Sequence, residues 1–331
     1  DSTSSRGLGD VYKRQPVNRD DYFAIAKLAV QRSFRALEHV PTDRADYGAI
    51  AKLAVESDPY ALQFVHAGCD DYVAIAKLAV QKNSLALQFV HAGCDDYEEI
   101  VKLAVQKNGL ALKYVPKDHA DYGEIAKVAV QKNGLALEYV PWDHADHGEL
   151  SKVAVQKDGL ALQWVLTDRD DYVELAKVAV QKNGLALEYV PQDRDDYAEL
   201  AKVAVQKDGL ALQWVHYQED DYQEIAKLAV ESTPYALEFV YDSSCDDYLD
   251  IAKLAVQKDS SVLRWVEFEG HHDYPDYNEL AMMAVQASWL ALKHVSIDLD
   301  DYLDIAKLAV QKDSRALQWV GFEDRHDCLL Y

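Results

Sequence analysis

The sequence predicts an all-α, right-handed α-solenoid of about twelve two-helix repeats of 25 residues. The first observation is a column of tyrosines that recurs every 25 residues from Tyr22 to Tyr222, and then at spacings of 26, 29 and 25. A short fixed period of this kind is typical of stacked repeats. The second observation is that each period holds two apolar patterns of helical spacing, separated by a helix-capping residue. The column comprises Tyr22, Tyr47, Tyr72, Tyr97, Tyr122, His147, Tyr172, Tyr197, Tyr222, Tyr248, Tyr277 and Tyr302.

The first helix of each repeat is predicted to start at the tyrosine column, over residues 97–107 in the fourth copy. Asp96 and Glu99 form a D-x-x-E pattern, which predicts a capping box that satisfies backbone N–H groups at the helix start. The apolar residues that follow are spaced as in an amphipathic helix, with lysines on the other face. This apolar stripe consists of Tyr97, Ile100, Val101, Ala104 and Val105.

The second helix is predicted over residues 109–115, with Asn108 as its N-cap. Two other copies carry proline at the position of Gly109, namely Pro59 and Pro234, and proline is favoured at the first helical position. The glycines of this column are therefore predicted to have negative φ, and they are Gly109, Gly134, Gly159, Gly184 and Gly209.

Helices this short are marginal in isolation, so the repeats must be stabilised by stacking on their neighbours. The residues predicted to be buried in the stack, together with their column mates, are Ile100, Leu103, Val105, Leu110, Leu112 and Tyr114.

The two ends of the chain do not fit the repeat. Residues 1–15 resemble a translated sequencing-library adapter and are predicted to be disordered, and residues 328–331 resemble the start of its opposite strand. Residues 16–327 are predicted to form a single solenoid domain.

The composition argues against nucleic-acid and membrane partners. The net charge is −23 and the acidic residues are spread along the repeats, whereas phosphate binding requires clustered Lys and Arg. No apolar run is long enough to span a membrane. Cys69, Cys94 and Cys245 share one loop column, and a separation of one repeat exceeds the reach of a disulfide. Scarce, unpaired cysteine predicts an intracellular, cytoplasmic location.

The motif A-V-x-x-N-G-x-A-L-x-Y, seen from Ala129 to Tyr139, resembles the repeat known as domain of unknown function 4116. The resemblance extends over nearly all of residues 20–322. The chain departs from the family at the helix start, which reads D-D-Y-x-E-I-A-K-L, and in the loop, which reads Pro-x-Asp. Because the family has no established activity, the resemblance implies a tandem helical repeat and leaves the function open.

Two metal-binding interpretations follow from the loops. Oxygen-rich loops such as Asp168, Asp170, Asp171 and Glu174 recur at fixed spacing and could hold Ca²⁺. They lack the mid-loop glycine and terminal glutamate of an EF-hand, and one capping aspartate with solvated acids at the helix start explains them without a metal. The loop histidines and cysteines lack the close pairs that zinc sites use. No cofactor is therefore predicted, and a calcium-binding array remains an alternative.

Two further columns are predicted to be structural. An aromatic residue precedes the last valine of most copies; base stacking would require a basic groove beside it, so this column is assigned to the core. It contains Phe64, Phe89, Tyr114, Tyr139, Trp164, Tyr189, Trp214, Phe239, Trp265 and Trp319. A lysine column, with members at Lys77, Lys102 and Lys202, lies three residues after the capping-box position, where Glu–Lys pairing across one helix turn is predicted.

The predicted function is a non-enzymatic scaffold for protein or peptide ligands, with a calcium array or a structural spacer as alternatives. No nucleophile–base pair, phosphate loop or dinucleotide fingerprint is present, and near-identical copies give no position unique chemistry. Variation between copies concentrates in the loops and in the residue after the tyrosine column, such as Glu98 and Gly123. Two loop aromatics suggest a contact strip that prefers basic partners. The predicted strip consists of Trp142, Asp143, Tyr217, Glu219 and Asp220.

Overall fold

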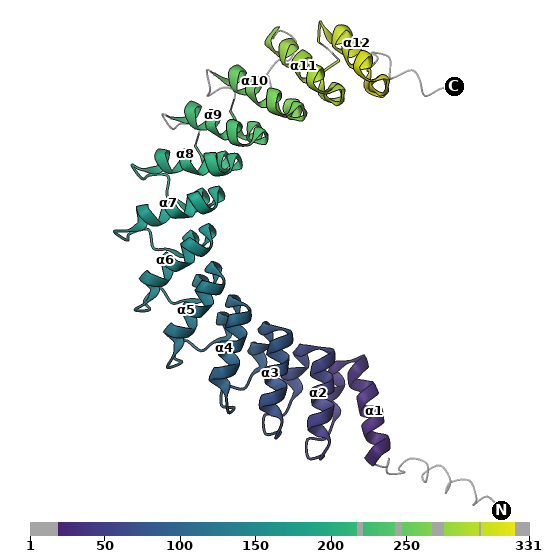
Figure 1. The fold of residues 1–331 in the computed structure, drawn as a ribbon, viewed down its shortest axis with the longest axis vertical. Helices are drawn as coiled ribbons and strands as arrows, with labels where there is room; N and C mark the ends of the chain where they lie inside the picture. The colour runs from purple at the N-terminus through teal and green to yellow at the C-terminus, as the bar shows by residue number, and fades with distance from the viewer. Residues whose placement is uncertain (1–18, 217–220, 242–246, 267–274, 298, 322–331) are drawn as a thin grey trace, which may run out of the picture. The chain divides into compact units, whose positions relative to one another are not determined.

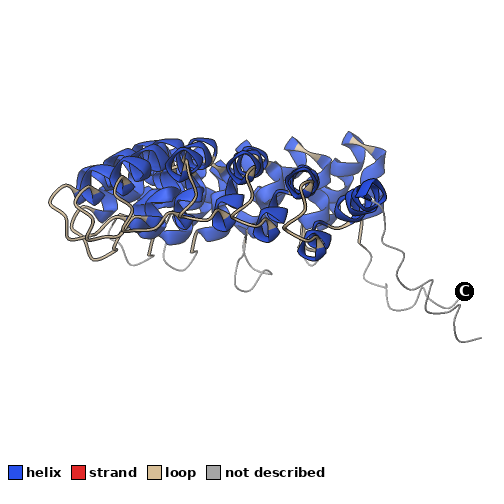
Figure 2. Cartoon of the chain, turned by 90° about the horizontal axis from the view of Figure 1, so that it is seen from below, coloured by secondary structure: helices blue, strands red, loops and turns tan. Residues whose placement is uncertain are grey.

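The structure, a computed structural model, describes residues 19–216, 221–241, 247–266, 275–297 and 299–321. Within these ranges every regular element is a helix and no strand occurs (Figure 2). The chain divides into two compact units, Asp1–Leu150 and Ser151–Tyr331. The single domain expected over 16–327 stays a prediction, and the two adapter-like ends lie outside the described residues.

Each repeat contains one α-helix followed by one short 3₁₀ helix (Figure 1). The α-helices in the described residues are α1 (Arg19–Arg32), α2 (Tyr47–Ser57), α3 (Tyr72–Lys82), α4 (Tyr97–Lys107), α5 (Tyr122–Lys132), α6 (His147–Lys157), α7 (Tyr172–Lys182), α8 (Tyr197–Lys207), α9 (Tyr222–Ser232), α10 (Tyr248–Lys258), α11 (Pro275–Ala287) and α12 (Tyr302–Lys312). The 3₁₀ helices are η1 (Phe34–His39), η2 (Pro59–Phe64), η3 (Ser84–Phe89), η4 (Gly109–Tyr114), η5 (Gly134–Tyr139), η6 (Gly159–Trp164), η7 (Gly184–Tyr189), η8 (Gly209–Trp214), η9 (Pro234–Phe239), η11 (Ser260–Trp265), η12 (Trp289–His294) and η13 (Ser314–Trp319).

Successive repeats stack in register within each unit. From α1 to α5 in the first unit, and from α7 to α12 in the second, each α-helix packs on the next α-helix, as Figure 1 shows. The 3₁₀ helices pack on one another in the same way and form the second layer. Most of the 3₁₀ helices also pack on the α-helix of the following repeat, which joins the two layers within each unit. The prediction of an all-α solenoid is confirmed.

The second helix of each repeat is confirmed, but it is a 3₁₀ helix. Its hydrogen bonds join residues three apart, as from the Val115 N–H to the Leu112 carbonyl. In a 3₁₀ helix, side chains three positions apart eclipse each other. Gly109, Leu112 and Val115 therefore share one face, and all three are buried. The 3₁₀ winding directs these three positions to the core.

The core prediction is correct in part. Ile100, Val105 and Leu112 are fully buried. Leu103, Leu110 and Tyr114 are only half-buried, so their assignment to the core is wrong. The 3₁₀ winding moves the Leu110 and Tyr114 columns to the flank of the second helix, and Leu103 lies one residue, about 100°, around the helix from the apolar stripe.

The aspartates at the starts of the α-helices do not cap them. In the part of the chain that the structure describes, the side chains that precede α2–α5, α7–α10 and α12 make no cap hydrogen bond. Most have ψ near 10°, as Asp171 does (φ −95°, ψ 11°), whereas an N-cap requires extended backbone. The capping-box prediction is therefore wrong, and these carboxylates are available for ion pairs.

The caps of the 3₁₀ helices follow the prediction. Asn108 has extended backbone (φ −146°, ψ 114°), and its Oδ1 accepts a hydrogen bond of 3.0 Å from the Leu110 N–H. Asp58 caps the proline-started η2 in the same way, at 2.8 Å from the Tyr60 N–H. The column thus satisfies one free N–H group at the start of most second helices.

The glycines at the starts of the 3₁₀ helices serve close packing between repeats. None of Gly109, Gly159, Gly184 and Gly209 has φ in the left-handed region, as predicted. A Cβ atom on Gly184 would overlap the carbonyl oxygen of Ala204 in the next repeat and would lie 3.0 Å from the Asp208 Cβ. The glycine-started helices η4, η6, η7 and η8 accordingly pack more closely on the following 3₁₀ helix than those that start with Pro, Ser or Trp.

In most described repeats the tyrosine column connects the α-helix to the loop of its own repeat. The buried Tyr172 hydroxyl donates a hydrogen bond of 2.9 Å to the carbonyl of Tyr189, seventeen residues further on. The Tyr72 hydroxyl also accepts a hydrogen bond of 2.8 Å from the His91 N–H. In the repeat of Tyr172 the equivalent residue is Pro191, which has no N–H group. These contacts fix the loop that leads into the next repeat.

Burial of these tyrosines predicts destabilisation at alkaline pH. Desolvation raises the pKa of Tyr122 and of Tyr172 to about 12, from an ordinary value of 10. Between these values the unfolded chain loses phenolic protons that the folded chain keeps, so the free energy of unfolding decreases as pH rises from about 10 to about 12. Urea denaturation over this range measures the decrease. Tyr172→Phe removes one ionising group and should make the decrease shallower; an unchanged slope would contradict this origin.

Candidate functional site

Ion pairs connect some of the successive α-helices. In the first unit, Lys77 of α3 lies 3.1 Å from Asp96 and 2.6 Å from Glu99, both of the next repeat. These hydrogen bonds, the one to Glu99 first, raise the pKa of the Lys77 ammonium. In the second unit, Lys202 lies 3.0 Å from Asp221 and 2.7 Å from Glu224. One lysine therefore bridges the two acidic columns of the following helix.

The predicted pairing within one helix also occurs, but its contacts are mostly longer. Lys177 lies 3.8 Å from Glu174, and Lys202 lies 3.9 Å from its own Glu199. At α12, Lys307 lies 2.9 Å from Asp304. The lysine column thus joins repeats as well as stabilising single helices, a role that the spacing along one helix does not reveal.

Loop arginines hold the same acidic column from the other side. Arg169 donates two hydrogen bonds of 2.8 Å to the Asp171 carboxylate, and this contact lowers the pKa of Asp171. Arg44 makes the same fork with Asp46 and lies 4.0 Å from the ring centroid of Tyr22 in the preceding repeat. The fork orients the carboxylate, while the arginine covers the preceding tyrosine.

Histidine replaces the loop arginine in two repeats of the first unit. The His119 ring lies 6.1 Å from that of Tyr97, and the His144 ring lies 5.6 Å from that of Tyr122. Both imidazoles accept a hydrogen bond of 3.1 Å through Nδ1 from the backbone N–H two residues later. Among the described residues, no group of three or more His, Cys, Asp or Glu side chains could hold a metal ion. These histidines have a structural role in their loops.

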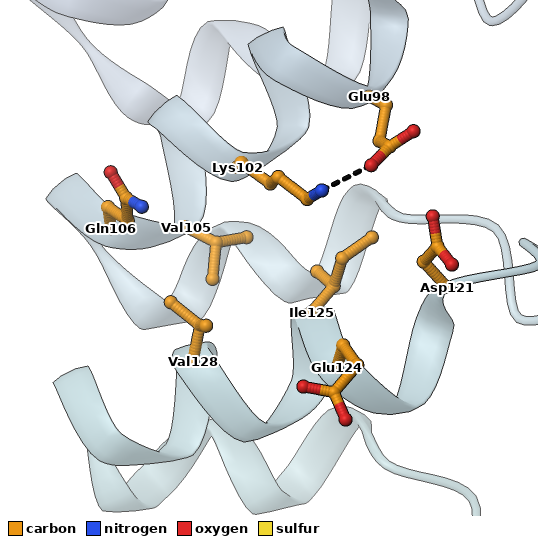
Figure 3. Close-up of a pocket in the computed structure, with 8 residues that line it drawn as sticks. All are labelled: Glu98, Lys102, Val105, Gln106, Asp121, Glu124, Ile125 and Val128. Carbon is orange, nitrogen blue, oxygen red and sulfur yellow. Dashed lines mark hydrogen bonds and ion pairs between the residues drawn. The ribbon is translucent and has the colours of Figure 1, made fainter.

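A groove of about 430 Å³ lies between α4 and α5 in the first unit. Figure 3 shows that Lys102 of α4 points to Glu98 of the same helix, with which it forms an ion pair. Asp121 and Glu124 stand across the groove at the start of α5. The remaining lining consists of Val105, Gln106, Ile125 and Val128.

This groove differs from the Lys77 and Lys202 junctions because the ion pair of Lys102 is with Glu98 of its own helix, and Asp121 adds only an electrostatic interaction. The bond to Glu98 raises the pKa of Lys102, and the same bond lowers the pKa of Glu98. Glu98 belongs to the variable column after the tyrosine, and it is the only acidic residue of that column. A glutamate four residues before the lysine predicts an ion pair within α4. That spacing alone does not show that the lysine is then drawn away from an ion pair with the next repeat.

The predicted contact strip is described only in its first half. Trp142 is 72% exposed in its loop, and Asp143 beside it is also exposed. Tyr217, Glu219 and Asp220 lie outside the described residues. Whether the two halves form one surface stays a prediction.

The aromatic column before the last valine is not a fully buried core ladder. Most of its described members are half-buried, and Trp164 is 37% exposed. The assignment of this column to the core is therefore wrong. The column lies on the flank of the second helix, because the 3₁₀ winding turns it away from the core. Tyr60 of η2 packs edge-on against Phe89 of η3 at 5.8 Å, so the column still contributes to stacking between repeats.

Part of the repeat array matches a known family model. Residues 74–119 and 97–144 match the family described as Domain of unknown function (DUF4116). Residues 74–144 are therefore similar to this family, and the described helices form a tandem repeat. The matched residues of this DUF4116-like protein include α4 and α5, and therefore the groove. No curated protein and no solved structure matches the chain. Among the described residues, none of the helices is long and apolar enough to cross a membrane.

Proposed function

We propose that this DUF4116-like protein is a non-enzymatic scaffold that binds proteins or peptides with basic surfaces. Stacked repeats present the same positions side by side along a unit, and such surfaces commonly hold extended ligands. The proposal rests on architecture and on side-chain chemistry, since no reactive group distinguishes one repeat from another. The free thiols of Cys69 and Cys94 support a cytoplasmic, reducing location as part of the same proposal.

The observation that carries the proposal is the exposure of Trp142. Other copies have Lys117, Thr167 or Gln192 at this loop position. A large aromatic side chain that is 72% exposed contributes little to the fold, whereas exposed tryptophans are frequent anchors of protein interfaces. The adjacent Asp143 and the negative net charge favour a basic ligand.

Selection of peptides from a random displayed library on the purified chain tests the proposal. We expect enrichment of peptides that carry Lys or Arg, and Trp142→Ala should weaken their binding about ten-fold without a change in the free energy of unfolding. Thr167→Ala, at the same loop position of another repeat, is the matched control and should leave affinity unchanged. Failure to enrich any basic peptide would favour the structural-spacer alternative over the scaffold.

A further inference from the structure

We propose that the 3₁₀ helices η11 and η12 bind the carboxylate groups of an acidic peptide through Arg264 and Lys293. This surface belongs to the second unit and takes a ligand of opposite charge to the one proposed for Trp142. The inference therefore goes beyond the proposed scaffold function and stands or falls separately from it.

The two cations occupy a surface column in which most other repeats carry glutamate or glutamine. This column comes directly before the aromatic column of the second helix, and all its members are exposed. Arg264 and Lys293 are the only cations of the column that follow one another in successive repeats. Their helices η11 and η12 pack on each other, so that one ligand can contact both. The column consists of Glu38, Gln63, Gln88, Lys113, Glu138, Gln163, Glu188, Gln213, Glu238, Arg264, Lys293 and Gln318.

The described part of the chain does not neutralise this pair. Neither Arg264 nor Lys293 forms an ion pair with any described residue. Asp259 adds only an electrostatic interaction with Arg264. Its carboxylate accepts hydrogen bonds of 2.9 Å from the Ser261 N–H and from the Tyr235 hydroxyl. Adjacent cations without a counterion repel each other, and a ligand carboxylate that contacts both relieves the repulsion.

Ring stacking holds the guanidinium group of Arg264 in place. Its Cζ atom lies 3.9 Å from the ring centroid of Trp265, and the Tyr235 ring packs on the same indole at 5.2 Å and 80°. A guanidinium held in this way loses less side-chain entropy when it binds a carboxylate. The same contacts occupy the ring on which a nucleobase would stack, and they favour a peptide over a single-stranded nucleic acid.

His294 shows that the two cations act on one shared place. It follows Lys293 in η12, and its Nε2 atom is buried without a hydrogen-bond partner among the described residues. Burial lowers the pKa of the His294 imidazole, and Lys293 of the same helix and Arg264 of η11 lower it further. A carboxylate bound between the two cations would favour the imidazolium and raise this pKa again.

The first test compares two fluorescent pentapeptides by anisotropy at low salt, acetyl-Gly-Glu-Leu-Glu-Gly amide and its twin with glutamine in place of both glutamates. Glutamine keeps the shape and lacks the charge, so we expect about five-fold weaker binding. Arg264→Gln and Lys293→Gln should each weaken the glutamate peptide by about three-fold. Lys113→Gln is the matched control, because it removes the same charge from the same column at a lone cation, and it should have no effect.

The second test measures the pKa of His294 by NMR, with its resonance assigned through His294→Gln. The glutamate peptide at saturation should raise the pKa of His294, and the glutamine twin should leave it unchanged. Arg264→Gln without peptide should also raise it, because one of the cations that lower it is absent. A charge effect that is spread over the whole surface would not separate the two peptides in this readout.

Equal binding of the two peptides, or full binding by both single variants, would overturn the proposal. A labelled single-stranded oligothymidine that binds more tightly than the glutamate peptide and depends on Arg264 would also overturn it, in favour of a nucleic acid. In each case the basic library peptides that depend on Trp142 still test the scaffold function by themselves, so the two failures are distinguishable.

Discussion

Replacing Leu112 with alanine is expected to lower the free energy of unfolding by about 2–5 kcal/mol. Leu112 is fully buried on the inner face of η4, and its removal leaves a cavity between the two layers. Because each repeat is stabilised by its neighbours, the loss should extend to the adjacent repeats. Urea denaturation followed by circular dichroism measures the free energy, and hydrogen exchange along the chain shows how far the damage spreads.

The same column provides a matched control at the last repeat. Leu317 is 62% exposed in η13, so Leu317→Ala removes little buried surface and should change stability by less than about 0.5 kcal/mol. Equal losses in the free energy of unfolding for the two variants would mean that the burial of the leucine does not determine its contribution to stability. Faster exchange confined to the repeat of Leu112 would argue against stacking as the source of stability.

Replacing Gly184 with alanine is expected to destabilise the second unit by about 1–3 kcal/mol. Alanine is intrinsically the better helix residue by roughly 0.5–1 kcal/mol, but its methyl group would overlap the Ala204 carbonyl oxygen of the next repeat. That oxygen belongs to the backbone of α8, so relief requires the two repeats to move apart. Thermal and urea denaturation of the variant measure the net effect.

Ser84→Ala is the matched control for this steric argument. Ser84 starts η3 in the same column and already carries a Cβ atom at a junction that is less closely packed. The control should stay within about 0.5 kcal/mol of wild type. A stabilised Gly184→Ala variant would show that the junction relaxes easily and that the glycine is not required for packing.

The period and the apolar columns made most of the fold predictable. Tyr97–Lys107 forms α4 with the predicted bounds, because an amphipathic stripe marks a helix directly in the sequence. The winding of the second helix was not predictable from its apolar residues, since a six-residue run fits either winding. The buried positions of that helix changed as a result, and Tyr114 moved to its flank.

The errors at the candidate site have one physical source. A D-x-x-E pattern acts as a capping box only if the aspartate has extended backbone, and the turn before each α-helix imposes a ψ near zero instead. Because the carboxylates do not cap the helix, they can form ion pairs with an arginine of the loop or with a lysine of the preceding repeat. Whether Asp121 gains such an ion pair depends on Glu98, in the preceding repeat, which the pattern within a single repeat does not include.

The hydroxyl contacts of the tyrosine column have a consequence for how the protein can evolve. They close within one repeat, as from Tyr172 to the Tyr189 carbonyl, and the 3₁₀ caps close within three residues. Gain or loss of one whole 25-residue block therefore leaves no backbone group stranded without its partner. A change of copy number by whole blocks would therefore lengthen or shorten both helical layers while the interior keeps the same packing.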